Sequence, residues 1–336
     1  MKLSEFDYDI PQARIAQHPL PNRESSRLCV LNRESDMFEH RLFKDIVEFL
    51  KPGDVLVLNN TKVIPARLYG TRASGGKTEI LLLKELQENV WEAIMKGAFK
   101  GKVSLKGGIT AHVSPSNGVA RVKFEGENIR GSLDKIGVMA LPPYIKRAAG
   151  KTDTERYQTV YADKEGAIAA PTAGLHFTDK IINAIKKKGI DVRMLTLHVG
   201  YGTFKPVRSD DIKNHVMDVE SYEISKETAG AVNLAKAEGR RVIAVGTTVT
   251  RALEASASGC SGRRIKSGQG DTSIFIYPGY EFRVIDALVT NFHQPKSTPM
   301  MLTSAFSGLS LLKKAYAGAQ KTGYRFFSYG DAMLVI

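Results

Sequence analysis

The chain has 336 residues, of which 43% are hydrophobic and 25% are charged. This length and composition exclude a disordered polypeptide and predict roughly two folded domains, each with its own core. Its 48 Lys and Arg residues outnumber its 35 Asp and Glu residues by 48 − 35 = 13, a balance that suits a polyanion such as RNA without identifying one.

The cysteine count and the N-terminal sequence restrict the class further. Cys29 and Cys260 are the two cysteines, which excludes a disulfide framework and a cysteine-based zinc site. The N-terminal sequence MKLSEFDYDIPQ places charged residues where a secretory signal needs an apolar stretch, and no run reaches the roughly 18 apolar residues of a membrane span. We expect a cytoplasmic, monomeric protein with no membrane partner.

The first third of the chain contains two kinds of pattern. Apolar residues recur at helical spacing in 41–50, and the turn 51–53 separates this helix from the apolar strand 54–58. From residue 66 onward the pattern changes to short segments divided by Gly, Asn and Pro, which is typical of a β-sandwich or barrel. We expect residues 66–145 to form a separate all-β barrel domain.

From residue 146 onward apolar strands alternate with amphipathic helices, the pattern of an α/β layer structure. The strands are predicted at 166–171, 190–199, 240–246 and 282–292, and the helices at 179–188, 226–238, 249–257 and 299–317. The fold class is therefore α/β, an α/β domain (1–65 and 146–336) with an inserted all-β barrel. The Ser- and Gly-rich stretch 255–271 is predicted to be a mobile basic loop, either simply solvated or in contact with RNA.

Neutral polar residues follow five of the predicted strands. These segments are 59–62, 171–178, 198–203, 246–248 and 291–295. Ligands of open α/β sheets bind outside the carboxyl ends of the strands, so these segments predict one shared site for a nucleoside-like ligand. The alternative is that the same residues only cap turns and helices independently.

Four histidines, His176, His198, His215 and His293, fall in or just after these segments and are candidates for proton transfer near neutral pH. The other three lie among ordinary surface patterns and are interpreted as structural or solvated. A metal site at 215–220 is the weaker interpretation, because no second spaced ligand pair accompanies it. We expect no metal.

An ordered set of motifs resembles one family, the S-adenosylmethionine:tRNA ribosyltransferase-isomerases of queuosine biosynthesis. The motifs are LPNRESSRL (20–28), VLNNTKVIPARL (57–68), ALPPYI (140–145), RYQTVYA (156–162), APTAGLHFT (170–178), LHVGYGTFKPV (197–207), VIAVGTTVTRALE (242–254), IFIYPGYEF (274–282), TNFHQPKSTPMML (290–302) and YRFFSYGDAMLVI (324–336). They cover the chain nearly end to end.

The resemblance implies an α/β domain with an inserted barrel, and it implies the reaction. Ribose from S-adenosylmethionine would be transferred to the aminomethyl group of 7-aminomethyl-7-deazaguanine at the tRNA wobble position and isomerised, giving epoxyqueuosine with release of adenine and methionine. S-adenosylmethionine would be consumed as a substrate, so no cofactor is expected. The expected partners are tRNA and S-adenosylmethionine.

Several positions depart from the pattern of the family. Asp218 stands where a second histidine is usual, and Gln294 and Pro299 replace leucines. Val249 and Thr250 replace a Ser-Val pair, and Tyr201 replaces a smaller residue. None of these departures removes a candidate histidine.

The reaction needs a base for a carbon-bound proton, because the sulfonium acidifies its neighbouring methylene, and an acid for the leaving adenine or ring oxygen. We assign base and acid to His176 and His198. Glu220 would hold the substrate amine or orient His215, its alternative role being a surface ion pair. Arg251 would bind the methionine carboxylate.

The predicted site residues fall into three groups. The catalytic candidates are His176, His198, His215 and Glu220. The substrate-binding candidates are Thr172, Gly174, Gly200, Gly246, Thr247, Thr248, Arg251, Asn291 and His293. The RNA-binding candidates are Asn60, Lys62, Arg67 and Lys205.

Two other functions fit parts of the pattern. A non-catalytic RNA-binding protein would need aromatic residues between the basic residues of the barrel, but residues 96–123 offer Phe99 alone. An α/β enzyme that acts on a small nucleoside would be indifferent to tRNA. Binding and turnover experiments with tRNA discriminate between these functions.

Overall fold

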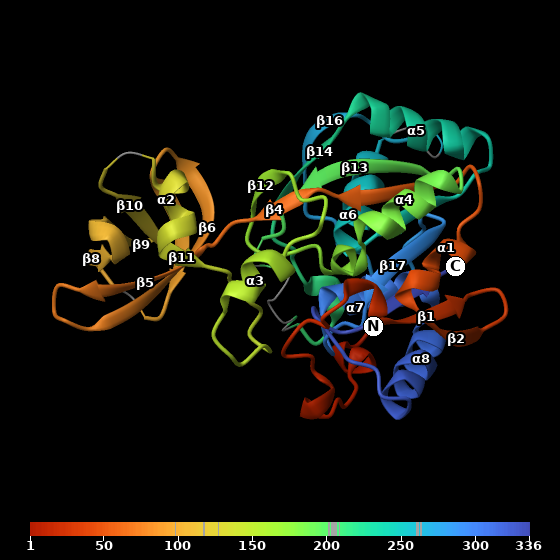
Figure 1. Ribbon diagram of the computed structural model, residues 1–336, viewed down its shortest axis with the longest axis horizontal. Helices are drawn as coiled ribbons and strands as arrows, with labels where there is room; N and C mark the ends of the chain where they lie inside the picture. Colours follow the sequence, from red (N-terminus) through yellow and green to blue (C-terminus); the bar gives the residue numbers. More distant parts are fainter. Residues whose placement is uncertain are drawn as a thin grey trace.

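The computed structural model describes residues 1–97, 99–116, 118–126, 128–200, 202, 207, 209–259, 262 and 264–336. An α/β domain forms the larger body, and a β-barrel lies beside it at one end of the molecule (Figure 1). The predicted fold class, an α/β domain with an inserted all-β barrel, is confirmed.

A nine-stranded mixed sheet forms the centre of the α/β domain. Its strands are β1 (Arg27–Asn32), β2 (Met37–Leu42), β3 (Val55–Asn59), β13 (Asp191–Leu197), β14 (Glu220–Ile224), β15 (Val242–Val245), β16 (Gly268–Thr272), β17 (Ala287–Asn291) and β18 (Ala332–Val335). Their order is β16-β14-β13-β3-β15-β17-β18-β1-β2. The four central strands β13, β3, β15 and β17 are parallel, so their carboxyl ends meet at one edge.

Helices cover both faces of this sheet. The α-helices are α1 (Ile46–Phe49), α2 (Ile129–Ile136), α3 (Lys151–Arg156), α4 (Asp179–Lys187), α5 (Lys226–Ala237), α6 (Thr247–Ser256), α7 (Thr298–Ser307) and α8 (Leu309–Lys321). The 3-10 helices are η1 (Leu3–Phe6), η2 (Gln12–Arg14), η3 (Arg23–Ser25), η4 (Phe43–Asp45), η5 (Lys106–Gly108), η6 (Thr172–His176) and η8 (Ile212–Asn214). None of the helices in the described ranges is long and apolar enough to cross a membrane.

The central strand β3 is buried on both faces. Val55 and Val57 contribute to one hydrophobic cluster with α5, α6, α7 and α8, whereas Leu56 and Leu58 contribute to a second cluster with α1 and α4. Successive side chains of a strand point to opposite faces, so a strand covered on both sides is uniformly apolar. This explains the apolar run predicted as a strand at 54–58.

The structure corrects two predicted elements. The helix predicted at 299–317 is two helices, because Gly308 between α7 and α8 has a φ of 82° and takes the chain out of the helical conformation. The strand predicted at 166–171 ends early. It is β12 (Lys164–Ala167), which pairs with β4 (Thr61–Val63) outside the nine-stranded sheet.

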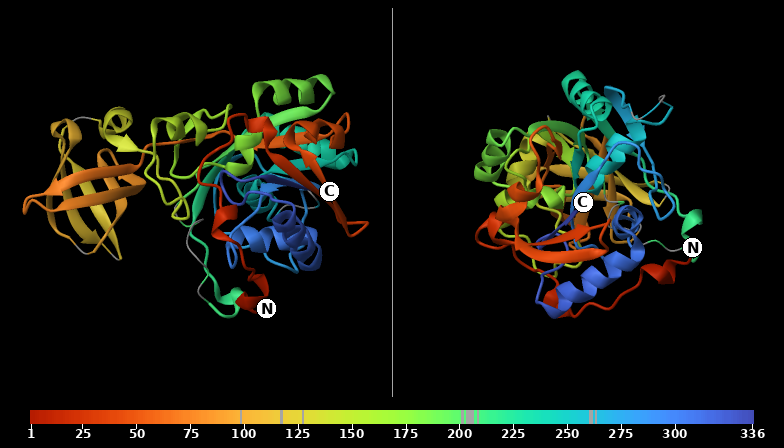
Figure 2. Two further views of the ribbon diagram at one scale, coloured as in Figure 1. Left: turned by 60° about the horizontal axis from the view of Figure 1, so that its bottom comes forward. Right: turned by 90° about the vertical axis from the view of Figure 1, so that its right-hand side faces the viewer.

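The barrel is closed by antiparallel strands. They are β5 (Arg67–Arg72), β6 (Lys77–Gln87), β7 (Val90–Met95), β8 (Gly101–Leu105), β9 (Thr110–Ser116) and β10 (Val119–Phe124), and the short β11 (Gly137–Val138) pairs antiparallel with β5. Pairing of β5 with β8 joins the two ends of this sheet, which removes the open edges of the barrel. Figure 2 shows the barrel projecting from the α/β domain.

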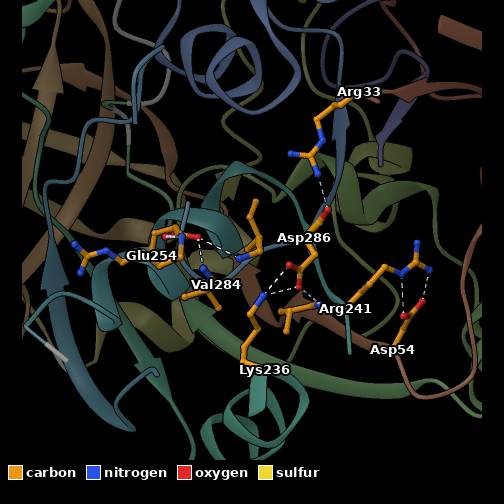
Figure 3. A network of polar contacts seen from close by, with 10 residues as sticks. Arg33, Asp54, Lys236, Arg241, Glu254, Val284 and Asp286 are labelled. Atoms are coloured by element: carbon orange, nitrogen blue, oxygen red, sulfur yellow. Dashed lines mark hydrogen bonds and ion pairs between the residues drawn. The ribbon is translucent and has the colours of Figure 1, made fainter. Parts of the chain in front are cut away.

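Ion pairs connect the residues that lie just before the central strands, at the amino ends of these strands (Figure 3). Asp54, just before β3, accepts a hydrogen bond from Arg241 Nε at 3.0 Å, just before β15. Asp286, just before β17, accepts Lys236 Nζ at 2.7 Å and the Val242 amide at 2.8 Å. These pairs hold three neighbouring strands in register at the end of the sheet opposite the segments predicted to bind the ligand.

Candidate active site

A polar pocket opens at the carboxyl ends of β15 and β17. It is lined by Tyr144, Ala169, Ala170, Pro171, Thr172, Ala173, Val199, Gly246, Thr247, Thr248, Thr290, Asn291, Phe292, His293, Gln294, Ser297, Pro299, Phe327 and Ser328. We call it the central pocket. Its empty volume is about 670 Å³, part of which is open solvent. None of its lining residues within the described ranges carries a fixed charge.

A chain of hydrogen bonds fixes Asn291 in the wall of the central pocket. Thr172 Oγ1 donates to Asn291 Oδ1 at 2.8 Å, and Asn291 Nδ2 donates to His176 Nε2 at 3.1 Å. His176 Nδ1 lies 2.8 Å from Ser26 Oγ, which donates its own proton to the Arg23 carbonyl. These directions are consistent only with a neutral imidazole that carries its proton on Nδ1.

His176 is the buried member of this chain. Its ring is 4% exposed and lies against Phe43 with ring centroids 5.0 Å apart. Burial, reinforced by the Arg23 and Arg325 cations, lowers the pKa of His176 from 6.5 to about 3. His176 therefore lies behind Asn291 rather than in the pocket lining, and its predicted role as acid or base stays a prediction.

His293 is the histidine that lines the central pocket in the part of the chain that the structure describes. Its Nε2 lies 2.7 Å from Thr290 Oγ1, and its backbone amide donates to the Tyr316 hydroxyl at 2.8 Å. Tyr8 donates to its carbonyl. Burial lowers the pKa of His293 to about 3, so the imidazole is neutral at physiological pH.

The first turn of α6 forms another wall of the central pocket. Gly246, directly before the helix, has a φ of 94°, a left-handed conformation that favours glycine. Thr247 and Thr248 follow it, and Thr248 Oγ1 accepts a hydrogen bond from Asn59 Nδ2 at 3.3 Å. The positive end of the helix dipole thus lies at the pocket, which favours a negatively charged or polar group there.

An extension of the central pocket leads to Arg251. This extension shares Thr247, Thr248 and Pro299 with the central pocket. The Arg251 side chain is 8% exposed, pairs with Glu220 Oε2 and donates from Nε to the Ile274 carbonyl at 3.2 Å.

The Arg251–Glu220 pair leaves a donor unused. Arg251 Nη2 is buried and has no hydrogen-bond partner among the described residues. Glu220 Oε1 accepts the Gly200 amide at 3.1 Å, so Glu220 orients both the arginine and the chain after β13. The predicted residues Gly200, Glu220 and Arg251 therefore lie together, at the far end of the extension.

His198 lies in a different depression. Its Nδ1 is 2.8 Å from Thr61 Oγ1, and the depression is lined also by Glu223 and Asp271 at the edge of the sheet. Burial and the Arg130 cation lower the pKa of His198, and Glu223 opposes this shift. His198 is not among the residues that line the central pocket, and its role as acid or base stays a prediction.

His215 follows η8 and contacts Phe275, with ring centroids 5.1 Å apart. Phe275 lines the extension that leads to Arg251. Burial lowers the pKa of His215, while Asp218 opposes the change. In the described ranges no group of three or more His, Cys, Asp and Glu side chains is placed to hold a metal ion.

Gly174 has a packing reason for being glycine. A Cβ atom there would lie 2.2 Å from the Tyr161 hydroxyl oxygen and 2.8 Å from Thr159 Cγ2. Gly174 does not line the central pocket, whereas its neighbour Thr172 does. The close packing of Gly174 fixes the course of η6, and through it the position of Thr172.

The predicted RNA-binding residues lie near the junction with the barrel. Asn60 accepts a hydrogen bond from Thr196 Oγ1 at 2.7 Å. Lys62 Nζ lies 2.9 Å from Glu165 Oε1, and Arg67 Nε lies 3.1 Å from Glu79 Oε1. Lys62 also lines a groove with residues of α2 and β11. The fourth predicted residue, Lys205, lies outside the described residues.

Several residues of the central pocket were not among the predicted site residues. Tyr144, Thr290, Phe327 and Ser328 line the central pocket, and the Tyr144 hydroxyl bonds Ser328 Oγ at 2.5 Å. All four lie inside strings that carry the resemblance, 140–145, 290–302 and 324–336. The family motifs therefore contain these pocket residues, whereas the strand patterns alone did not indicate them.

The fold and the pocket define a class first: an α/β protein whose central parallel strands end at a polar pocket without fixed charges among its described lining residues. The family described as "Queuosine biosynthesis protein" matches residues 3–335. The S-adenosylmethionine:tRNA ribosyltransferase-isomerases of Halothermothrix orenii and Clostridioides difficile are each 48% identical to this chain, over 100% of both chains. The chain belongs to the queuosine biosynthesis protein family.

A solved structure supports the same assignment. The crystal structure of S-adenosylmethionine tRNA ribosyltransferase from Thermotoga maritima is 36% identical to this chain. The two superpose with a TM-score of 0.58, over 99% of this chain and 100% of that one. The family resemblance inferred from the sequence motifs is confirmed.

Proposed function

We propose that this protein transfers the ribosyl moiety of S-adenosylmethionine to 7-aminomethyl-7-deazaguanine at the wobble position of tRNA and isomerises it, giving epoxyqueuosine-tRNA. Adenine and methionine are the other products. S-adenosylmethionine is consumed as a substrate, and no separate cofactor is required. The reaction takes place in the cytoplasm, where tRNA and S-adenosylmethionine are available to a monomeric enzyme.

The observation that carries this proposal is the neutral lining of the central pocket. A sulfonium is a fixed cation, and neither a fixed positive charge nor a carboxylate belongs to the described lining residues. Thr172, Thr247, Thr290 and Asn291 instead offer hydroxyl and amide groups, which hydrogen-bond a nucleoside without neutralising the sulfonium. The sulfonium thereby keeps its ability to acidify the neighbouring methylene.

Arg251 suits the methionine carboxylate. Its free Nη2 is buried at the end of the extension, and the positive end of the α6 dipole lies between it and the central pocket. A carboxylate bound there would complete the hydrogen bonding of Arg251. Glu220 would hold the guanidinium in place, rather than serve as a surface ion pair, because both side chains are buried.

Proton transfer falls to residues that can reach the ligand. His293 lines the central pocket, so its imidazole lies beside the bound ligand and is the candidate to accept the proton from the sulfonium-adjacent methylene. His176 acts through Asn291, which it orients. His198 faces a separate depression that Glu223 and Asp271 also line.

Mass spectrometry tests this function. The substrate is tRNA carrying the aminomethyl-deazaguanine, incubated with the protein and S-adenosylmethionine. We expect the mass of the epoxycyclopentane adduct on that base, with adenine and methionine in the supernatant. A methyl adduct, or an unchanged base, would contradict the proposal.

A further inference from the structure

Three arginines from separate segments gather behind the central pocket. Arg23 lies in η3, Arg156 ends α3, and Arg325 lies before β18. Arg23 and Arg156 line a small depression together with Pro19, Leu20, Ser26, Leu175, His176, Ser328, Tyr329 and Gly330. Its empty volume is about 290 Å³, part of which is open solvent. We call this depression the arginine pocket.

The three guanidinium groups bond to neutral carbonyl oxygens. Arg23 donates to the carbonyls of Leu175 at 3.0 Å and Glu155 at 3.1 Å. Arg156 donates to the carbonyl of Pro21 at 2.8 Å, and Arg325 donates to that of His18. Within the described ranges, none of the three makes an ion pair with a carboxylate.

Two donors of this cluster are left over. Arg156 Nε and Arg325 Nη1 are buried and have no hydrogen-bond partner in the part of the chain that the structure describes. Burial and the Arg156 cation lower the pKa of Arg23, and Glu155 opposes this shift. Asp331 likewise opposes the effect of burial on the pKa of Arg325. Buried donors without partners are costly, so the cluster is suited to an anion with several acceptor oxygens.

The arginine pocket and the central pocket share a wall. Ser328 lines both, and His176 joins Ser26 in the arginine pocket to Asn291 in the central pocket. An anion held by the arginines would therefore lie next to the groups that contact the nucleoside.

We propose that the arginine pocket binds a backbone phosphate of the tRNA substrate and so holds the neighbouring nucleotide at the central pocket. This inference rests on the proposed function. A phosphodiester presents two non-bridging oxygens that share a negative charge, and planar guanidinium groups bind such oxygens through paired hydrogen bonds. Free phosphate shares this chemistry, and the experiment separates the two sources.

The test uses the Arg156→Gln and Arg325→Gln variants, singly and together. Each single change is expected to raise the KM for tRNA about tenfold, as for loss of a charge-assisted hydrogen bond, and to leave the KM for S-adenosylmethionine unchanged. Each should also reduce the slope of log affinity against log salt by about one unit. Arg156→Lys, which keeps the charge but not the planar fork, should recover part of the loss.

Arg33→Gln is the matched control. Arg33 also donates to carbonyl oxygens, but it is exposed and lies at the amino end of the sheet, where it donates to the Asp286 carbonyl at 3.0 Å. Its replacement should leave both KM values unchanged. If the arginine-pocket variants fold, by circular dichroism and thermal melting, and keep the wild-type KM for tRNA, the proposal is wrong.

A second measurement compares salt competition in the wild-type protein and in the double variant. Inorganic phosphate should compete with tRNA more strongly than chloride does at equal ionic strength, and this difference should vanish in the double variant. Equal inhibition by phosphate and chloride would contradict the proposed phosphate site. Phosphate competition that persists in the double variant would place the anion elsewhere. Failure of the proposed function would look different, because the wild-type protein would then form no ribosyl adduct under any salt condition.

Discussion

The two ends of the central sheet differ in their chemistry. At the amino ends, Asp54 and Asp286 are each satisfied by a cation and by backbone amides. At the carboxyl ends, the central pocket is lined by neutral groups such as Thr172, Asn291 and His293. The charged residues near that end are Arg251 and the arginines behind the central pocket. Their guanidinium groups contain buried hydrogen-bond donors that have no partner among the described residues.

This difference separates stability from ligand binding within one domain. Paired charges at the amino ends fix the strand register, so their loss should weaken the fold without touching the pocket. Buried hydrogen-bond donors without partners at the carboxyl ends lower the stability of the fold unless a ligand accepts their hydrogen bonds. Variants at the two ends should therefore change different measurements.

The largest expected effect is on turnover, at the carboxyl end. His293→Ala should lower kcat about 100- to 10,000-fold, because it removes the imidazole that lines the pocket. Binding of both substrates, measured by calorimetry, should survive. The control is His112→Ala on the barrel, where the imidazole is exposed and pairs with Glu125. If His293→Ala keeps a near wild-type kcat, His293 is not the base, and His176 and His198 are the remaining candidates.

The second effect is on stability, at the amino end. Asp54→Asn leaves the Arg241 guanidinium without its anion, so the free energy of unfolding should fall by about 3 kcal/mol. Activity at 25 °C should be unchanged in urea-free buffer. Asp36→Asn, which breaks an exposed pair with Lys314, should change stability by less than about 1 kcal/mol. A loss of kcat in Asp54→Asn would mean that the two ends are coupled.

The third effect concerns pH. The pKa of His176 is about 3 in the folded protein and about 6.5 in an unfolded chain, so the unfolded state binds the extra proton between these values. Stability contributed by neutral His176 is present above pH 6.5 and is lost as the pH falls toward 3. The slope is about 1.4 kcal/mol per pH unit in the middle of this window. Urea unfolding of the wild type and of His176→Gln at pH 4.5 and 7 measures it, and identical pH slopes would contradict the prediction.

The smallest effect concerns RNA at the junction with the barrel. Replacing Lys62 and Arg67 together with Gln should weaken tRNA binding several-fold, because both are surface residues already paired with carboxylates. Binding of S-adenosylmethionine should be unchanged. Gel-shift titrations at two salt concentrations provide the measurement. Equal loss of both ligands would indicate a disturbed fold or a shared pocket.

Local patterns in the sequence predicted the main elements of the fold. Both faces of β3 are covered by helices, so 55–58 is continuously apolar and its strand could be predicted. The break at Gly308 was missed, because a single glycine within an apolar periodic run does not reveal its φ. The order of nine strands was equally out of reach, since β1 and β18 lie almost at opposite ends of the chain yet pair in parallel.

The sequence by itself determined which residues are candidates for the chemistry: neutral polar groups after the strands, four histidines beside them, and the motifs of the family. Only the tertiary structure decided which of these residues meet. His176, His198 and His293 all follow strands, but strand order and side-chain direction separate them. His293 lines the central pocket, His176 lies behind its wall, and His198 lines a different depression. The physical reason is that a strand end fixes the edge of the sheet where a residue lies, whereas hydrogen bonds to distant partners such as Ser26 and Thr61 fix where its side chain points.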